Sequence, residues 1–105
     1  MNDPAVQDDA SKTLDLLRDR GWFRAMSGVP TAGYGNGNNC MLTAANQCGL
    51  MSLQLAIVKV IREQYPDRSF GDCNAPSNMQ IIYFNDHPDT TFADVERVFE
   101  KVIAS

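Results

Sequence analysis

The chain has 105 residues, of which 44% are hydrophobic and 21% are charged, and its formal net charge is −4. This length and composition predict one globular domain, residues 1–105, with a core of its own. The acidic balance excludes nonspecific binding to duplex nucleic acid, which needs clustered Lys and Arg. The chain has no apolar run near the roughly 18 residues of a membrane span, and its first residues lack the pattern of a signal peptide. We therefore expect a cytoplasmic protein that does not bind membranes.

The three cysteines are an odd number, which indicates a reducing compartment rather than a disulfide framework. Cys40 and Cys48 are eight residues apart in one expected helix. That spacing is about 12 Å along the axis at a rise of about 1.5 Å per residue. Two thiolates that share a zinc ion lie within roughly 4 Å of each other. We expect no metal site, and nothing in the sequence indicates a cofactor.

The sequence predicts a first helix over residues 4–20. Asp3 is placed to cap its start, because a carboxylate can accept from the free backbone N–H groups of the first turn. Gly21 predicts its end, in the left-handed conformation of a Schellman motif. In that ending Trp22 would pack back on Leu17.

Residues 28–39 contain four glycines and three asparagines, which indicates a loop. The glycine spacing does not match a dinucleotide or phosphate-loop fingerprint. Two helices are predicted after it, over residues 40–48 with Asn39 as the N-cap and over residues 53–65 with Ser52 as the N-cap. The second is apolar around most of its circumference, which predicts a central position in the fold. Its apolar residues are Leu53, Leu55, Ala56, Ile57, Val58, Val60 and Ile61.

The last helix is predicted over residues 92–103, where apolar residues recur at steps of three and four. Thr91 is placed to cap it, and Asp94 lies near its positive end. The apolar stripe consists of Phe92, Val95, Val98, Phe99 and Val102.

Residues 78–86 allow two interpretations. A helix is favoured, because Ser77 and Gln80 fit the S-x-x-Q capping box. The alternative is a buried strand over residues 79–84, which are rich in residues typical of strands. Pro88 then ends the segment at a turn. The predicted fold is all-α, a compact bundle of about five short helices.

Three segments of the sequence resemble a family of short uncharacterised proteins from actinobacteria and their phages. They are DRGW at residues 19–22, CMLTAA at residues 40–45, and FNDHPDTT at residues 84–91, followed by Asp94 and Val95. The family pattern is a helix ending in RGW, a C-x-x-G-A helix start and a W-N-D-x-P-x-R-T corner. The resemblance implies a small helical domain, and the family has no defined function.

This chain departs from the family pattern at three positions. Phe84 stands in place of Trp, Thr43 in place of Gly, and Thr90 in place of Arg. Any role that needs that arginine does not transfer to this chain.

The candidate site lies around the corner between the last two helices. Asn85 and Asp86 suit hydrogen bonds to backbone donors in the turn and at the start of the following helix. The alternative is a pocket in which these polar residues meet aromatic side chains and bind a ligand. The candidate binding residues are Trp22, Tyr34, Asn85, Asp86, His87 and Asp89.

Cys40 and His87 permit a second hypothesis, nucleophilic catalysis. A thiol at a helix N-terminus has a lowered pKa, and His87 is the one imidazole in the sequence. The competing interpretation is that Cys40 packs as a small buried hydrophobe. No catalytic residue is assigned on this basis.

We expect recognition of a macromolecule rather than catalysis, because no pair of residues has the spacing that a named reaction demands. The expected partner is a protein with a basic surface, which this chain recognises or inhibits. If the chain is encoded by a phage, the partner is a protein of the host. The oligomeric state stays open. The alternative is a small-molecule binder or minor enzyme near Asp86, His87 and Cys40. The expected partner surface consists of Asp8, Asp15, Asp19, Gly35, Asn36 and Asn38.

Overall fold

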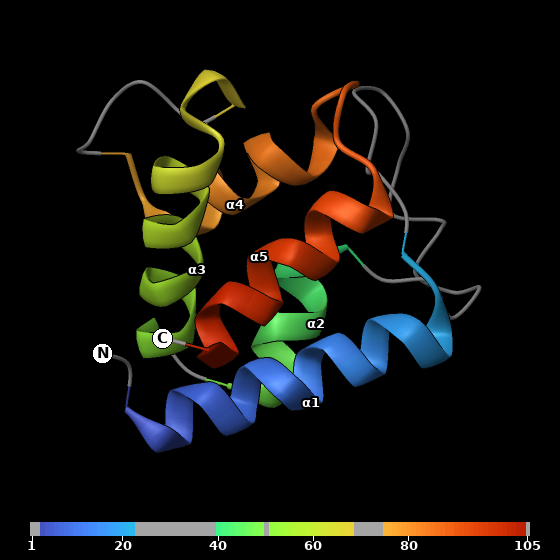
Figure 1. The fold of residues 1–105 in the computed structure, drawn as a ribbon, viewed down its shortest axis with the longest axis vertical. Coiled ribbons are helices and arrows are strands. Elements are labelled where there is room, and N and C mark those ends of the chain that lie inside the picture. Colours follow the sequence, from blue (N-terminus) through green and yellow to red (C-terminus); the bar gives the residue numbers. More distant parts are fainter. Residues whose placement is uncertain (1–2, 23–39, 50, 69–74, 105) are drawn as a thin grey trace.

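The computed structural model describes residues 3–22, 40–49, 51–68 and 75–104. Within them the fold is all-α, as predicted, and residues 79–84 belong to a helix rather than to a strand. The elements are α1 (Pro4–Arg20), α2 (Met41–Cys48), α3 (Met51–Gln64), the 3-10 turn η2 (Pro66–Arg68), α4 (Ser77–Asp86) and α5 (Phe92–Ala104) (Figure 1). Among these residues, no helix combines the length and apolar character that crossing a membrane requires.

Local sequence explains the start of α1 but not its end. Asp3 caps the helix as predicted, with its carboxylate accepting from the Ala5 backbone N–H at 2.8 Å. The Schellman prediction at Gly21 is wrong, because this residue has φ 91° and ψ 151°, outside the left-handed helical region. The positive φ still favours glycine. The Gly21 N–H donates to the Leu17 carbonyl, which is an ordinary helical hydrogen bond.

The turn between α2 and α3 brings three helices close together. A side chain at Gly49 would place its Cβ 2.7 Å from Leu53 Cδ2 in α3 and 3.2 Å from Asp9 Cβ in α1. The close approach therefore favours glycine, because a Cβ here would force the fully buried Leu53 side chain to shift. Ser52 is not the N-cap that the sequence predicted, since α3 already begins at Met51. The predicted cap of α2, Asn39, lies outside the described residues.

The two C-terminal helices begin in different ways. The S-x-x-Q capping box is wrong, because α4 begins at Ser77 itself and has no side-chain cap. The Ser77 hydroxyl instead donates to Gln54 Oε1 of α3 at 3.0 Å, and the Gln80 amide donates to the Ala75 carbonyl at 2.7 Å. Thr91 caps α5 as predicted, and the Thr91 N–H donates in return to Asp94 Oδ2 at 3.1 Å.

The core is one continuous cluster to which every helix contributes. α3 contacts all the other helices, as its apolar circumference predicted, although Leu55 points outward and is 57% exposed. α5 crosses the middle of the molecule beside α1 (Figure 1). The fully buried residues on α5 are Val95, Val98, Phe99 and Val102.

Candidate functional site

α4 presents two apolar faces, and only one of them packs in the core. The inner face carries Gln80, Ile81, Phe84 and Asn85, all buried. The outer face carries Met79, Ile82, Tyr83 and Asp86, which recur at the i, i+3, i+4, i+7 spacing of a single helical stripe. Helices that lie on a protein surface usually carry polar residues on the outer face. This helix instead carries three apolar residues followed by one carboxylate.

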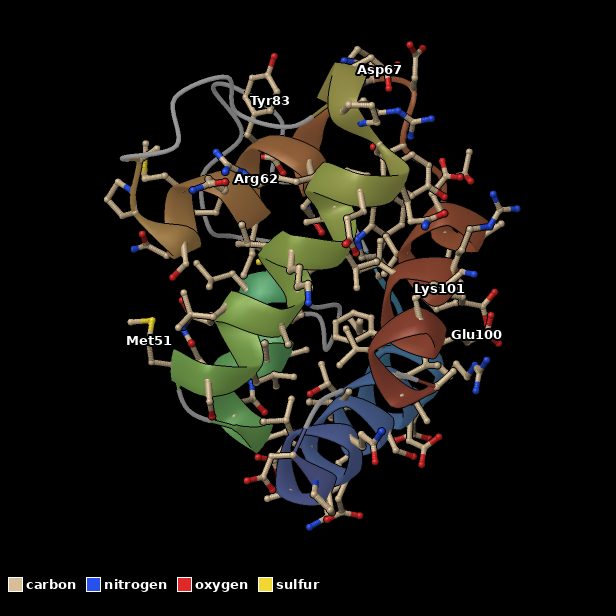
Figure 2. The ribbon with its side chains drawn as sticks, turned by 60° about the vertical axis from the view of Figure 1, so that its left-hand side comes forward. Met51, Arg62, Asp67, Tyr83, Glu100 and Lys101 are labelled. Atoms are coloured by element: carbon tan, nitrogen blue, oxygen red, sulfur yellow. The ribbon has the colours of Figure 1, made fainter. Side chains whose placement is uncertain are left out.

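The outer stripe and the following turn line an open groove of about 460 Å³. Met79 and Tyr83 are 47% and 43% exposed. The Tyr83 side chain points outward from α4 (Figure 2). The wall of the groove is mostly apolar. Its described lining residues are Met79, Ile82, Tyr83, Asp86, His87 and Pro88.

Asn85 fixes the position of this corner from within the core. Its side-chain oxygen accepts from the Trp22 indole Nε1 at 2.6 Å and from the Met41 backbone N–H at 2.9 Å. The Met41 N–H belongs to the first turn of α2, where helical N–H groups lack helical acceptors. Asn85 therefore caps α2 from another helix. The sequence predicted that Asn85 would bond backbone donors at the start of the following helix, α5. That helix is instead capped by Thr91.

Asp86 is held by the same amide. The Asn85 Nδ2 donates to Asp86 Oδ1 at 3.0 Å, so the carboxylate at the groove has one oxygen in a defined position. Three of the segments that carry the family resemblance thus meet at one point, through Trp22, Met41 and the Asn85–Asp86 pair.

His87 shapes the turn that closes the groove. Its Nδ1 accepts from the Asp89 backbone N–H at 3.1 Å, which places the proton of the neutral ring on Nε2. The Tyr83 ring meets the His87 ring edge-on, with centroids 6.2 Å apart. Asp89 is exposed and contributes its backbone to this turn, and it is not among the described residues of the groove.

A charged network behind the turn was missed by the sequence analysis. Arg68 of η2 donates to Asp94 Oδ2 at 2.9 Å and to the Thr90 hydroxyl at 3.2 Å. The Tyr65 hydroxyl donates to Asp94 Oδ1 at 3.1 Å. The Arg68 guanidinium also lies 4.7 Å from the centre of the Tyr65 ring. These contacts tie the end of α3 to the start of α5.

The network shifts the pKa values of its members. Burial disfavours the charged form of Asp94, but hydrogen bonds from Arg68, the Thr91 backbone and Tyr65 together outweigh it and hold the Asp94 pKa below its usual range. Burial raises the pKa of the Tyr65 hydroxyl, and its hydrogen bond to Asp94 adds to the increase. Asp94 is therefore an ionised structural carboxylate at neutral pH.

The other predicted site residues do not gather at this groove. Trp22 lies on the core side of Asn85 and stacks on Phe92, with ring centroids 6.1 Å apart. Cys40 is 4% exposed, in keeping with a packed hydrophobe, and is not among the described lining residues. Tyr34 and the loop residues Gly35, Asn36 and Asn38 lie outside the described residues.

The predicted acidic residues lie on another part of the surface. Asp8 forms an ion pair with Lys12 at 3.0 Å, and Asp15 and Asp19 are exposed. α1 runs along one edge of the molecule, whereas α4 lies toward the opposite edge (Figure 1).

The comparisons with known proteins identify a family but no activity. No curated protein and no solved structure matches this chain. A family model described as a family of unknown function (DUF6197) matches residues 1–105. Since the match spans the whole sequence, the chain belongs to this family of unknown function.

Proposed function

We propose that the protein acts by binding another protein, and that the outer face of α4 is its contact surface. The observation that supports this proposal is the outer stripe of α4, where Met79 and Tyr83 are exposed and Ile82 is half-buried, on a helix whose opposite face already packs in the core. An apolar stripe at helical spacing is the feature through which amphipathic helices contact partners. Methionine and tyrosine suit such a surface, because one adapts its shape and the other offers a large amphipathic ring.

The expected partner has a basic surface around an apolar contact. The chain carries 13 acidic and 9 basic residues, and Asp86 lies at the groove. Complementary charge speeds association and selects the partner more than it adds affinity. Because α1 lies away from α4, we assign Asp15 and Asp19 to steering rather than to direct contact. If the chain comes from a phage, one of the two sources of the family that it resembles, the partner is a host protein that binding would inhibit.

A small-molecule ligand is the alternative function. The groove volume of about 460 Å³ falls in the range of about 300–1,000 Å³ that is usual for ligand sites. Such sites enclose most of their ligand, whereas this groove is open to solvent. Mass spectrometry of the denatured, purified protein distinguishes the two functions, since a bound metabolite released in stoichiometric amount would support the alternative.

The test is a comparison of three immobilised proteins incubated with a lysate of the cell in which the protein acts. They are wild type, Tyr83→Ser and the matched control Leu55→Ser, whose residue is also a large exposed hydrophobe but lies on α3. We expect wild type and Leu55→Ser to capture the same protein and Tyr83→Ser to lose it. Because both residues are exposed, all three proteins should melt at similar temperatures. Equal capture by Tyr83→Ser would contradict the proposal.

A further inference from the structure

Among the described residues of the α4 groove, the formal charge is concentrated at one point. Among the described lining residues, Asp86 carries the one formal charge when His87 is neutral. Met79, Ile82 and Pro88 provide apolar walls, and Tyr83 provides an aromatic ring. The groove therefore combines a carboxylate, a ring and an apolar wall within one site.

The carboxylate is positioned before any partner arrives. Asp86 Oδ1 accepts from Asn85 Nδ2 at 3.0 Å, and Asn85 is itself held by Trp22 and by the start of α2. Asn85 is 1% exposed, so this support comes from the core rather than from a mobile surface side chain. A preorganised group loses less conformational entropy on binding.

These three features match one side chain better than the others. Arginine carries a planar guanidinium that hydrogen bonds to carboxylates and stacks on aromatic rings, on a stem of methylenes that packs on apolar surface. Lysine shares the charge, but its ammonium is a compact and strongly hydrated point charge that does not use a ring in this way. The net charge of −4 further favours a basic group.

We propose that the α4 groove binds an arginine side chain of the partner protein, with its stem against Met79 and Ile82 and its guanidinium between the Tyr83 ring and Asp86. This inference rests on the proposed function and names the chemistry of the partner at that surface. It also makes Asp86 a recognition residue, in addition to its contact with Asn85.

The test uses N-acetyl-arginine N-methylamide as the probe, titrated at millimolar concentration into protein with isotope-labelled methionine methyl groups and backbone amides. The neutral control is N-acetyl-citrulline N-methylamide, which has nearly the same shape without the charge. We expect saturable NMR shifts at the Met79 methyl and at the Tyr83 and His87 amides with arginine. Citrulline should bind about two- to fivefold more weakly than arginine, which corresponds to the loss of one exposed ion pair. The Met51 methyl, 58% exposed on α3, should stay unchanged.

Two variants complete the test. Asp86→Asn keeps an oxygen that can accept from Asn85 and should weaken arginine binding by about the same factor as the change to citrulline, whereas Asp15→Asn on α1 should leave binding intact. Equal shifts with citrulline, equal shifts with N-acetyl-lysine N-methylamide, or unchanged binding by Asp86→Asn would each overturn the inference, and so would no shift at all. Loss of the captured protein in Tyr83→Ser without any arginine shift would leave the proposed function standing and this inference refuted. An arginine shift with capture that does not depend on Tyr83 would refute the proposed function instead.

Discussion

Replacing Asn85 by alanine should destabilise the fold more than its size suggests. The substitution leaves the buried Met41 N–H and the partly buried Trp22 Nε1–H without their shared acceptor. A buried donor that loses its acceptor costs about 1–3 kcal/mol, so the two together cost about 2–6 kcal/mol. Domains of this size have a total stability of about 5–15 kcal/mol. The melting temperature should therefore fall by at least about 10 °C.

Urea unfolding measures this cost directly. The single tryptophan of the chain is itself a partner of Asn85, so its fluorescence reports on the site while far-ultraviolet circular dichroism reports on the helices. Gln47→Ala is the matched control, because it removes an exposed amide from α2 and should change the free energy of unfolding by less than about 0.5 kcal/mol.

A double-mutant cycle with Trp22→Phe isolates the indole contribution. Phenylalanine keeps a ring against Phe92 but lacks the donor, so its cost should be about 1 kcal/mol smaller once Asn85 is already alanine. Additive costs would show that the indole and the amide are not coupled. If the free energy of unfolding of Asn85→Ala lies within about 0.5 kcal/mol of the wild-type value, Asn85 does not hold α2 and Trp22 in place as described.

The remaining predictions concern the packing and charges that hold α4 and α5 in place. Asp94→Asn should cost about 1–3 kcal/mol at pH 7. Because the Asp94 pKa lies below its unfolded value, this contribution is present above about pH 4 and is lost as the pH falls through the folded pKa, so the free energies of unfolding of wild type and variant should converge below the folded pKa. Gly49→Ala should cost about 1–3 kcal/mol by calorimetry, because its Cβ meets a side-chain carbon of α3 at 2.7 Å, and an unchanged melting temperature would contradict that packing. Arg18→Ala, which removes the exposed ion pair with Glu96, should cost less than about 1 kcal/mol, and a cost that stays the same in 0.5 M salt would contradict an electrostatic origin.

Several features that depend on neighbours in the sequence were predictable, although the local predictions at Gly21 and Ser52 were wrong. The caps at Asp3 and Thr91 involve residues two or three positions away, and the apolar stripe of α5 follows from its spacing. The capping box at Ser77 failed, although its spacing was correct, because Gln54 on α3 provides a tertiary partner for the Ser77 hydroxyl. A local motif is reliable only when no distant group competes for the same donor or acceptor.

The supporting contacts of the candidate site were not predictable for the same reason. Asn85 reaches partners 44 and 63 residues away, and Arg68 reaches Asp94 across 26 residues, distances that spacing alone does not encode. The sequence indicated that Asn85 and Asp86 matter, but it did not predict where each side chain points. Asn85 points into the core, whereas Asp86 lines the groove. The outer stripe of α4 was available from the sequence. It was missed because the strand interpretation of residues 79–84 competed with the helix, and only in a helix do Met79, Ile82 and Tyr83 share a face.

Photo-crosslinking from position 83 determines whether a partner protein contacts the outer face of α4. The photoreactive residue p-benzoyl-phenylalanine replaces Tyr83 in one protein and Leu55 in another, and each is irradiated in a lysate of the cell in which the protein acts. Both positions are exposed and aromatic or apolar, so the two proteins differ mainly in the surface that they probe. We predict one specific crosslinked protein from position 83, suppressed by excess unmodified chain but not by excess Tyr83→Ser, and no such product from position 55. A competed crosslink from position 55 with none from position 83 would show that the contact surface lies elsewhere than on α4.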